Sequence, residues 1–334
     1  MALLVQAMVW FKMALLPRSR YRRGLHSLVW LVALILLLAG KSAAGAGNSS
    51  ISAQANPDNF AVEGQIWSTA QSQFVDIAWL TAMAAAADVF VIGESHGHHA
   101  HQDRETFLVQ ALADRRIYPA VVLEMLDASQ AEALARSRER SPESVAPLPV
   151  ALNWAATGWP AFEFYRNLFQ AAYDAKLPII AGDLPKSRQD DLRSGRLQPP
   201  PVSGSILQSW RETMLAAHCG LLPEPDLTRV AGLQVERDRS MASALESALH
   251  DGKPVILVAG LSHIRRDRSV PLHLAPERKS FVLALMEVSD RKPPQAYLPQ
   301  ALDGERPVYD AIWFTPARKE EGACDRLRRK GLIR

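Results

Sequence analysis

The chain of 334 residues has 48% hydrophobic and 22% charged residues, the composition of a globular protein long enough to bury a sizeable core. The chain has 38 basic and 35 acidic residues, and residues 1–46 hold six of the basic residues and none of the acidic ones. Residues 47–334 therefore have 32 (38 − 6) basic and 35 acidic residues, a formal charge of −3. This balance excludes the strongly basic surface that marks a nucleic-acid-binding protein.

The first 46 residues predict a secretory signal peptide. A basic block at residues 18–23 precedes an apolar run of about a dozen residues, Leu28–Gly40, and Ala44-Gly45-Ala46 then offers a cleavage site. This order of basic, apolar and small segments is typical of export signals. The apolar run is shorter than the roughly 20 residues of a membrane span, and an uncleaved N-terminal anchor is the alternative. We therefore expect an exported, periplasmic protein, without a lipid anchor because no cysteine lies directly after the run.

Beyond the leader, residues 47–65 predict a flexible lead-in and residues 66–334 a single domain. Short apolar runs predict strands at 89–92, 120–124, 178–182, 255–259, 281–287 and 310–314, since strands buried on both faces lack polar alternation. Helical patterns lie between them at 100–116, 129–141, 159–176, 205–217 and 234–250. This alternation predicts an α/β fold, with a mostly parallel sheet and helices on both faces. A helical insertion over about 185–250 is expected to cap the sheet edge.

Ionisable side chains follow four of the predicted strands. Glu94 and His96 follow the first, Glu124 ends the second, Asp183 ends the third and His263 follows the fourth. Because the carboxyl ends of parallel strands meet at one edge of a sheet, where ligands bind, we expect these side chains to lie close together.

Two chemistries suit the set of Glu94, His96, Glu124 and His263. Imidazole nitrogens and carboxylate oxygens can bind a divalent metal such as Zn, Mn or Fe. Alternatively, a histidine held by a glutamate can act as a metal-free general base in hydrolysis. The set is therefore a candidate both as metal ligands and as catalytic residues.

Structural roles are the competing interpretation of the acidic residues. Glu94 and Glu124 could form salt bridges with Arg104 or Arg265, since an unpaired buried carboxylate is costly. Asp183 could equally be a helix cap or turn residue.

Histidines beside the same predicted edge are candidate ligands of a haem or a transition metal. His98 and His99 come directly after the first strand, and His101 opens the next helical pattern. A solvated loop and helix start is the alternative for all three.

Tyr165 is a second kind of candidate, because phenolate binds ferric haem in some proteins. Phe162, Tyr165 and Phe169 also have the helical spacing of a core stripe, while Trp154 and Trp159 could wall an apolar pocket. Arg265 and Arg266, with Arg268, could hold a haem propionate or form ordinary surface charge.

The chain has two cysteines, Cys219 and Cys324. In an exported protein they predict a disulfide that ties the C-terminal tail to the body. Two free thiols are the alternative, and a lone pair lacks the spacing of a zinc knuckle.

Several segments resemble, in the same order, the ChaN-like haem-binding uptake proteins of the Tiki superfamily, which is related to TraB-like proteins, Tiki proteases and erythromycin esterases. The segments are "VIGESHGHHAHQ", "VVLEMLD", "GWPAFEFYRNLFQAAYDAKLPIIAGDLP", "QVERDRSMASAL", "VILVAGLSHIRRDRSVPLHL" and "DAIWFTP". The shared pattern of a strand-end glutamate with G-x-x-H, a second glutamate and a late histidine falls on Glu94, His96, Glu124 and His263.

The resemblance implies an α/β fold with these residues in a pocket. For the ChaN-like branch it implies haem binding, by a monomer or a homodimer, in haem or iron uptake. For the protease and esterase branches it implies hydrolysis. ChaN-like proteins can be lipoproteins, and this chain departs from them in lacking a lipid-bearing cysteine.

Overall fold

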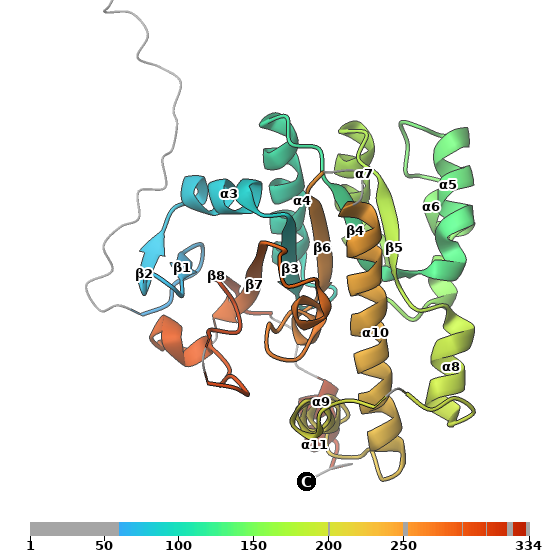
Figure 1. Cartoon of the computed structure of the whole chain (residues 1–334), viewed down its shortest axis with the longest axis vertical. Coiled ribbons are helices and arrows are strands. Elements are labelled where there is room, and N and C mark those ends of the chain that lie inside the picture. The colour runs from blue at the N-terminus through green and yellow to red at the C-terminus, as the bar shows by residue number, and fades with distance from the viewer. Residues whose placement is uncertain are drawn as a thin grey trace, which may run out of the picture. The chain divides into compact units, whose positions relative to one another are not determined.

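Eight strands form one mixed sheet in a computed structural model of the chain, in the order β2-β1-β8-β7-β3-β6-β4-β5 (Figure 1). The structure describes residues 60–199, 201–249, 253–288, 290–304, 306–318 and 323–331. The strands are β1 Ile66–Ser68, β2 Gln73–Val75, β3 Val89–Glu94, β4 Ala120–Asp127, β5 Ile179–Asp183, β6 Val255–Gly260, β7 Ser280–Val288 and β8 Ala311–Pro316. Strand β1 is antiparallel to β2 and β8, and the neighbours from β8 to β5 run parallel.

The predicted α/β class is confirmed, and all six predicted strands are present with bounds that agree to within three residues. The short antiparallel strands β1 and β2 were not predicted, because runs of three residues are too short to show a periodic pattern.

The α-helices of the described part are α3 Ile77–Ala86, α4 His99–Asp114, α5 Ala131–Arg140, α6 Leu148–Ala151, α7 Arg166–Asp174, α8 Lys186–Ser194, α9 Gly204–Ala217, α10 Asp226–Leu249 and α11 Ala323–Arg329. In Figure 1, α10 crosses in front of the sheet, whereas α4 and α7 lie behind it.

Successive residues of the central strands face opposite layers of core. In β3, Phe90 and Ile92 belong to the cluster that includes residues of α4 and α7, whereas Val89 and Val91 belong to the cluster that includes residues of α10. Side chains alternate across a strand, and both faces are covered. This double burial explains why these strands are apolar without alternation.

Two helix predictions were wrong at their start: the helix expected from residue 234 begins at Asp226, and the one expected from residue 159 begins at Arg166. The pattern at 159–176 becomes helical only at α7, and a short 3-10 helix, Phe162–Phe164, precedes it. Pro160 disfavours helix in the residue before it, and Gly158 has a φ of 86°, outside the helical region. The aromatic stripe itself is core, because Phe162, Tyr165 and Phe169 are all buried.

The predicted insertion over about 185–250 consists of α8, α9 and the long α10. Trp210 and Met214 of α9 pack with Leu227, Ala231 and Val235 of α10 in a separate apolar cluster. Figure 1 shows α9 beyond the carboxyl ends of the strands, next to α11.

The predicted disulfide is confirmed: Cys219, just after α9, is bonded to Cys324 of α11, 105 residues later. The predicted signal peptide and most of the predicted lead-in lie outside the described residues. Among the described helices, none is both long and apolar enough to cross a membrane.

Candidate functional site

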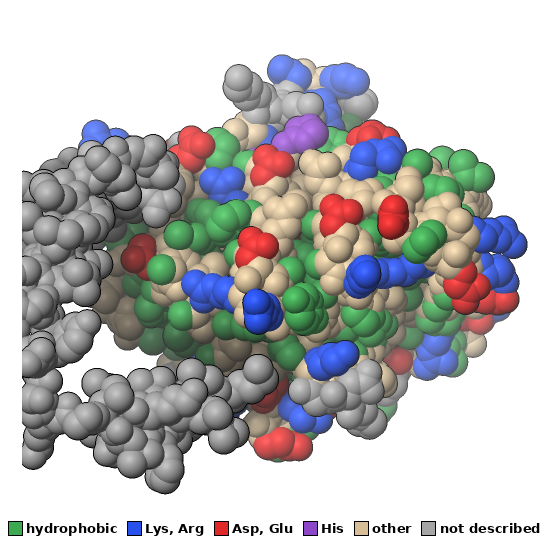
Figure 2. All heavy atoms as spheres, turned by 90° about the horizontal axis from the view of Figure 1, so that it is seen from above, with side chains coloured by type: hydrophobic (Ala, Val, Ile, Leu, Met, Phe, Trp, Pro, Cys, Tyr) green, Lys and Arg blue, Asp and Glu red, His purple; other side chains and the backbone are tan. Residues whose placement is uncertain are grey.

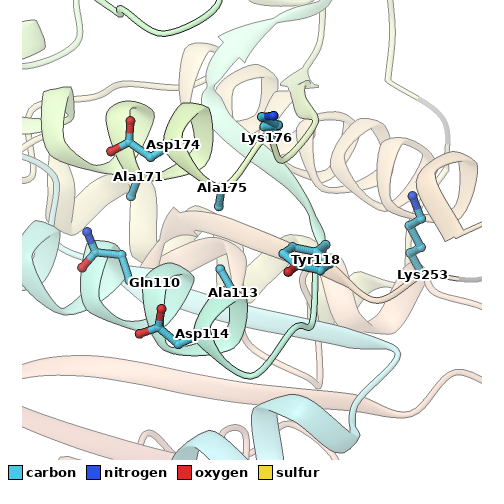
Figure 3. Close-up of a pocket in the computed structure, with 9 residues that line it drawn as sticks. All are labelled: Gln110, Ala113, Asp114, Tyr118, Ala171, Asp174, Ala175, Lys176 and Lys253. Carbon is cyan, nitrogen blue, oxygen red and sulfur yellow. The ribbon is translucent and has the colours of Figure 1, made fainter. Parts of the chain in front are cut away.

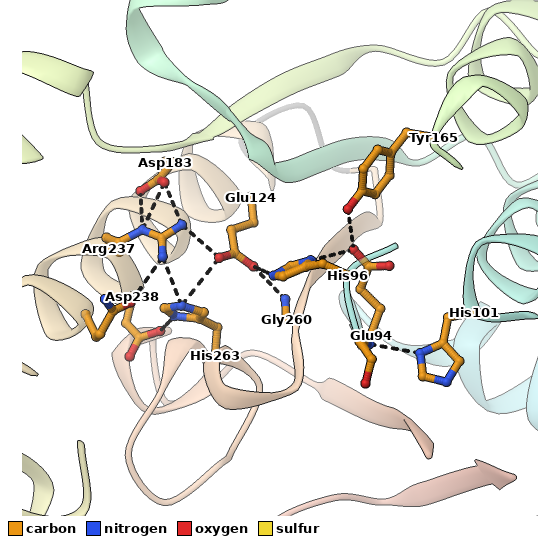
Figure 4. Close-up of polar contacts among 12 residues, drawn as sticks. Glu94, His96, His101, Glu124, Tyr165, Asp183, Arg237, Asp238, Gly260 and His263 are labelled. Carbon is orange, nitrogen blue, oxygen red and sulfur yellow. Dashed lines mark hydrogen bonds and ion pairs between the residues drawn. The ribbon is translucent and has the colours of Figure 1, made fainter. Parts of the chain in front are cut away.

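The polar residues that end four strands lie together at one edge of the sheet (Figure 4). Their strands are neighbours in the order β3-β6-β4-β5, so a parallel arrangement brings the four carboxyl ends side by side. Glu94, Glu124, Asp183 and His263 are at most 3% exposed. The side chain of His96 is 29% exposed, which makes it the accessible member of the predicted set.

Glu94 holds His96 through a hydrogen bond of 2.7 Å between Oε1 and Nδ1. The hydroxyl of Tyr165 donates to the same oxygen at 3.2 Å, and the amide of Gln102 donates to Oε2. Three side chains therefore satisfy the hydrogen-bonding capacity of this buried carboxyl group. With the proton of the imidazole on Nδ1, Nε2 is the nitrogen left to accept a proton or a ligand.

The pKa of His96 is raised above its usual value. Burial alone would lower it, but the charge of Glu124 and the hydrogen bond and charge of Glu94 outweigh burial and the opposing charge of Arg237. The Nε2 atom lies 3.7 Å from Oε2 of Glu124, and the ring of Trp159 meets the imidazole edge-on at 4.8 Å. The surroundings of this imidazole therefore favour its protonated form more than water does.

Glu124 is ionised and fully engaged. Arg237 of α10 donates to its Oε1 at 2.8 Å, and the backbone N–H of Gly260 donates to Oε2 at 2.5 Å. Burial raises the pKa of Glu124, but His263, Arg237 and His96 together with the Gly260 N–H lower it to about 2. The carboxylate thus supplies a fixed negative charge beside both imidazoles.

Arg237 also makes a forked contact with Asp183, whose oxygens accept from Nε and Nη2 over 2.7–3.0 Å. Burial raises the pKa of Asp183, and the guanidinium opposes that shift. Asp183 therefore holds Arg237 in place rather than facing a ligand, and it also accepts from the N–H of Leu184 at 2.8 Å.

His263 belongs to a second carboxylate–imidazole pair. Its Nδ1 lies 2.7 Å from Oδ1 of Asp238 on α10, and both side chains are buried. Burial raises the pKa of Asp238 to about 6, against the opposing influence of His263. The Nε2 atom of His263 lies 3.4 Å from Glu124 Oε1 and 3.4 Å from Arg237 Nη1.

Gly260 allows the close approach of these groups. A Cβ atom at this position would lie 2.8 Å from His96 Nε2 and 3.5 Å from Glu124 Oε2. A side chain here would therefore displace the imidazole from the strand end.

Of the salt bridges considered for the two glutamates, that of Glu124 forms with a different arginine, Arg237, whereas Glu94 pairs with His96. Arg104 lies over the ring of Trp313, and Arg265 pairs with Asp267. Arg237 forms the ion pair with Glu124. The expected salt bridge of Glu124 is therefore present, but its partner is neither Arg104 nor Arg265.

The histidines after β3 divide into two buried residues and one exposed residue. His101 accepts at Nδ1 from the N–H of Ser95 at 2.9 Å and contacts Thr315 Oγ1 through Nε2 at 2.9 Å. Burial, with the charges of His98, Arg318 and Arg104, lowers its pKa to about 3. His98 is also buried, and its Nε2 lies 3.0 Å from the Pro316 carbonyl. These two imidazoles join the start of α4 to the end of β8, so the solvated-loop alternative was wrong for them.

His99 is exposed and stacks on Phe164, with ring centroids 4.4 Å apart. Tyr165 is fully buried, and burial together with Glu94 raises the pKa of its phenol, which stays protonated. The structure thus presents His99 to solvent and directs the Tyr165 hydroxyl to Glu94.

The arginines of the basic loop after β6 all have partners. Arg265 makes two contacts with Asp267, at 3.0 and 2.6 Å. Arg266 makes two with Asp310, also at 3.0 and 2.6 Å. Arg268 is buried over Trp210 and donates to Ser209 and Thr213 of α9, so this loop fastens α9 to the sheet edge.

Within the described ranges, no group of three or more histidine, cysteine, aspartate or glutamate side chains is arranged to hold a metal ion. Glu124 is turned to Arg237 and a backbone N–H, and His263 is turned to Asp238. In this arrangement hydrogen bonds join Glu94 to His96, Arg237 to Glu124 and His263, and His263 to Asp238.

Sequence reasoning missed four polar residues of this network: Gln102 and Glu105 of α4, and Arg237 and Asp238 of α10. Glu105 is fully buried, and burial together with the neighbouring charge of Glu94 raises its pKa well above the usual value. The available signal was the sequence "QVERDRS", where charged residues recur on a helix with buried apolar neighbours.

The fold and the site define a class of α/β proteins in which glutamate and histidine side chains meet at the carboxyl edge of a mostly parallel sheet. The chain belongs to the family described as haem-binding uptake, Tiki superfamily, ChaN, whose model matches residues 80–274. The resemblance noted in the sequence is therefore confirmed.

A solved structure has the same fold. The structure described as "Cofacial heme binding to ChaN of Campylobacter jejuni" has 21% sequence identity and a TM-score of 0.61, covering 74% of this chain and 95% of that one. A variant of the erythromycin esterase EreC in its open conformation has 16% identity and a TM-score of 0.44, covering 74% and 95%. No curated protein matches the sequence significantly.

Proposed function

We propose that the chain is an exported, periplasmic protein that binds haem in haem or iron uptake. Family membership supports this function, and the solved ChaN of Campylobacter jejuni binds haem cofacially. The observation in this chain that carries the proposal is the presentation of His99, an exposed imidazole stacked on Phe164 beside the polar sheet edge.

The side chains at this edge fit a haem. Imidazole is an axial ligand of haem iron, and His99 and the part-exposed His96 are the histidines within 96–101 that solvent reaches. Trp159 adds an aromatic surface beside His96. Reaching an iron with Tyr165 would require its hydroxyl to leave Glu94, so we rank His99 ahead of Tyr165, and ahead of His98, as the iron ligand.

A haem titration of the purified protein followed by absorbance tests this function. We expect a saturable shift of the Soret band that is lost in His99→Ala and retained in His218→Ala, a histidine at the end of α9 whose Nδ1 contacts the Met214 carbonyl. If His99→Ala shows the same Soret shift as the unmodified protein, His99 is not the iron ligand. The absence of saturable binding by the unmodified protein would reject haem binding.

A homodimer is part of the same proposal, because cofacial binding places two haems against one another. Sedimentation of the protein with and without haem tests it. We expect the mass to double on haem addition or to be that of a dimer throughout.

Hydrolysis is the second candidate function, and the Glu94–His96 pair favours it. A carboxylate that fixes the imidazole proton on Nδ1 leaves Nε2 to take a proton from water. The protonated imidazole would be stabilised by Glu124, whose charge lies 3.7 Å away. A metal-dependent version would need the same donors to leave their present partners.

A panel of ester and peptide substrates tests this candidate with and without a chelator. His96→Ala and Glu94→Gln should abolish turnover while His99→Ala retains it. Turnover that survives in His96→Ala would reject the assignment, and loss of turnover with the chelator would identify a metal-dependent reaction.

A further inference from the structure

A cavity of about 540 Å³ borders the candidate site on the side of β4 and β5. Its volume lies within the roughly 300–1,000 Å³ of small-molecule sites. Residues after β4, the loop 152–159, one face of α8 and Arg237 of α10 line it. Trp159 and Arg237 belong to both places, since Trp159 packs on His96 and Arg237 binds Glu124.

The cavity has two exposed cations on its α8 side. Lys186, Gln189 and Arg193 follow one another at helical spacing on one face of α8 and all line the cavity. The side chains of Lys186 and Arg193 are 55% and 51% exposed. Both contact Asp190, which is not among the lining residues, and a single carboxylate leaves several of their N–H donors available.

The acidic residue that lines the cavity is occupied locally. Asp127 accepts from the backbone N–H of Ser129 at 2.8 Å and also from its hydroxyl. The carboxylates that balance Arg237 lie behind it at the strand ends. The groups that face a ligand entering the cavity are therefore mainly donors, beside the aromatic wall of Trp159.

The arginines after β6 are poorer anchors for an anionic ligand. The side chains of Arg265 and Arg266 are 12% and 21% exposed, and each makes two contacts with one aspartate. A carboxylate arriving there would have to displace a bidentate partner. At Lys186 and Arg193 it would meet donors already turned to solvent.

We propose that Lys186 and Arg193 bind the propionate carboxylates of haem, so that the carboxylate edge of the porphyrin occupies this cavity and its apolar part contacts Trp159. This inference rests on the proposed haem function and adds the anchoring residues to it.

Another cavity, of about 680 Å³, lies between α4 and α7 and includes Asp114, Tyr118, Asp174, Lys176 and Lys253 (Figure 3). It forms from residues before β4 and β6, at the opposite ends of the strands from His96. Its two lysines make it a matched control. The face seen in Figure 2 carries acidic, basic and hydrophobic side chains interspersed.

The test compares haem with haem dimethyl ester, in which both carboxylates are blocked. The unmodified protein and the control Lys176→Glu/Lys253→Glu should bind haem at least about tenfold more tightly than the ester, as expected for lost charged hydrogen bonds. Lys186→Glu/Arg193→Glu should bind haem about tenfold more weakly and lose the preference over the ester. Lys186→Arg/Arg193→Lys should restore it.

The two proposals fail in different ways. If the unmodified protein binds neither compound, haem binding itself is rejected and the anchoring role falls with it. If it binds haem and Lys186→Glu/Arg193→Glu keeps both the affinity and the preference over the ester, haem binding stands and the anchoring role is overturned. Equal thermal unfolding of all variants, measured by circular dichroism, separates either result from misfolding.

Discussion

Arg237 donates from Nη2 to Oε1 of Glu124 over 2.8 Å, which fastens the middle of α10 to the end of β4. The arginine and the glutamate are 12% and 1% exposed. Because the same guanidinium holds Asp183 at the end of β5, one residue neutralises the ends of two neighbouring strands. The buried carboxylates of the site depend on it.

Replacing Arg237 with Met should destabilise the protein by about 3–5 kcal/mol, because it leaves two buried carboxylates without their cation. Urea unfolding at neutral pH measures this. Arg188→Met is the matched control, since Arg188 is largely exposed and lies 3.5 Å from Glu236, a kind of pair that contributes little. Similar losses in both variants would contradict the assigned role of Arg237.

Glu105 should make stability depend on pH. Its raised pKa means that the folded protein keeps a proton that the unfolded chain releases above about 4.3. The resulting stability is present below that pH and is lost as the pH rises toward the folded pKa. In Glu105→Gln the amide carries no titrating proton, so the variant should gain stability relative to the unmodified protein between pH 5 and pH 8.

Urea unfolding of both proteins across this range checks the prediction. Glu63→Gln, at an exposed position, serves as the control and should show a constant difference. A constant difference for Glu105→Gln as well would show that Glu105 is ionised in the folded protein.

The strands and the polar edge could be predicted from the sequence because both depend on local pattern. Val89–Ile92 and Val255–Ala259 are apolar without alternation, which only doubly buried strands tolerate. Glu94, Glu124 and His263 come directly at or after such runs. Parallel topology then brings distant residues to one edge, although the position of β6 between β3 and β4 has no local signal.

The partners of these residues could not be predicted in the same way. Arg237 and Asp238 lie on a helix of 24 residues, and periodicity does not say which of its charged positions meets which strand end. Arg104 and Arg265 were closer in sequence to Glu94 and His263, yet Trp313 and Asp267 engage them. Long-range pairing depends on how α10 crosses the sheet, which only the folded chain determines.

The disulfide between Cys219 and Cys324 should stabilise the protein by about 2–4 kcal/mol, because it restricts a long loop in the unfolded chain. Cys219→Ser/Cys324→Ser should unfold at correspondingly lower urea concentration. The unmodified protein should match the variant once a reductant is added. Equal stability of the variant and the oxidised protein would contradict a contribution from this bond.

Gly260→Ala should impair function more than folding. The added methyl group would lie 2.8 Å from His96 Nε2, so the part-exposed imidazole must turn away from Glu124. We expect loss of the hydrolysis proposed for His96 as the second candidate function, and a raised solvent exposure of the ring, seen as faster modification by diethylpyrocarbonate. Gly204→Ala is the control, because a Cβ there meets no atom within 4 Å. Unchanged activity in Gly260→Ala would show that the imidazole does not act from its observed position.

The imidazole of His96 should titrate above the usual value of about 6.5, since Glu124 and Glu94 favour its charged form more than burial opposes it. Glu124→Gln removes the larger of the two favourable charges and should lower this pKa, and Glu94→Gln should lower it by weakening the hydrogen bond to Nδ1. NMR titration of the ring protons, assigned with His96→Ala, measures the pKa of His96 in the unmodified protein and in both variants.

Because the folded pKa is raised, protonation of His96 stabilises the fold below about pH 6.5 and this contribution is lost as the pH rises through the folded value. A reaction that uses Nε2 as a base would have the opposite dependence and increase with pH over the same interval. If the pKa of His96 is the same in Glu124→Gln and in the unmodified protein, the charge of Glu124 does not act on His96.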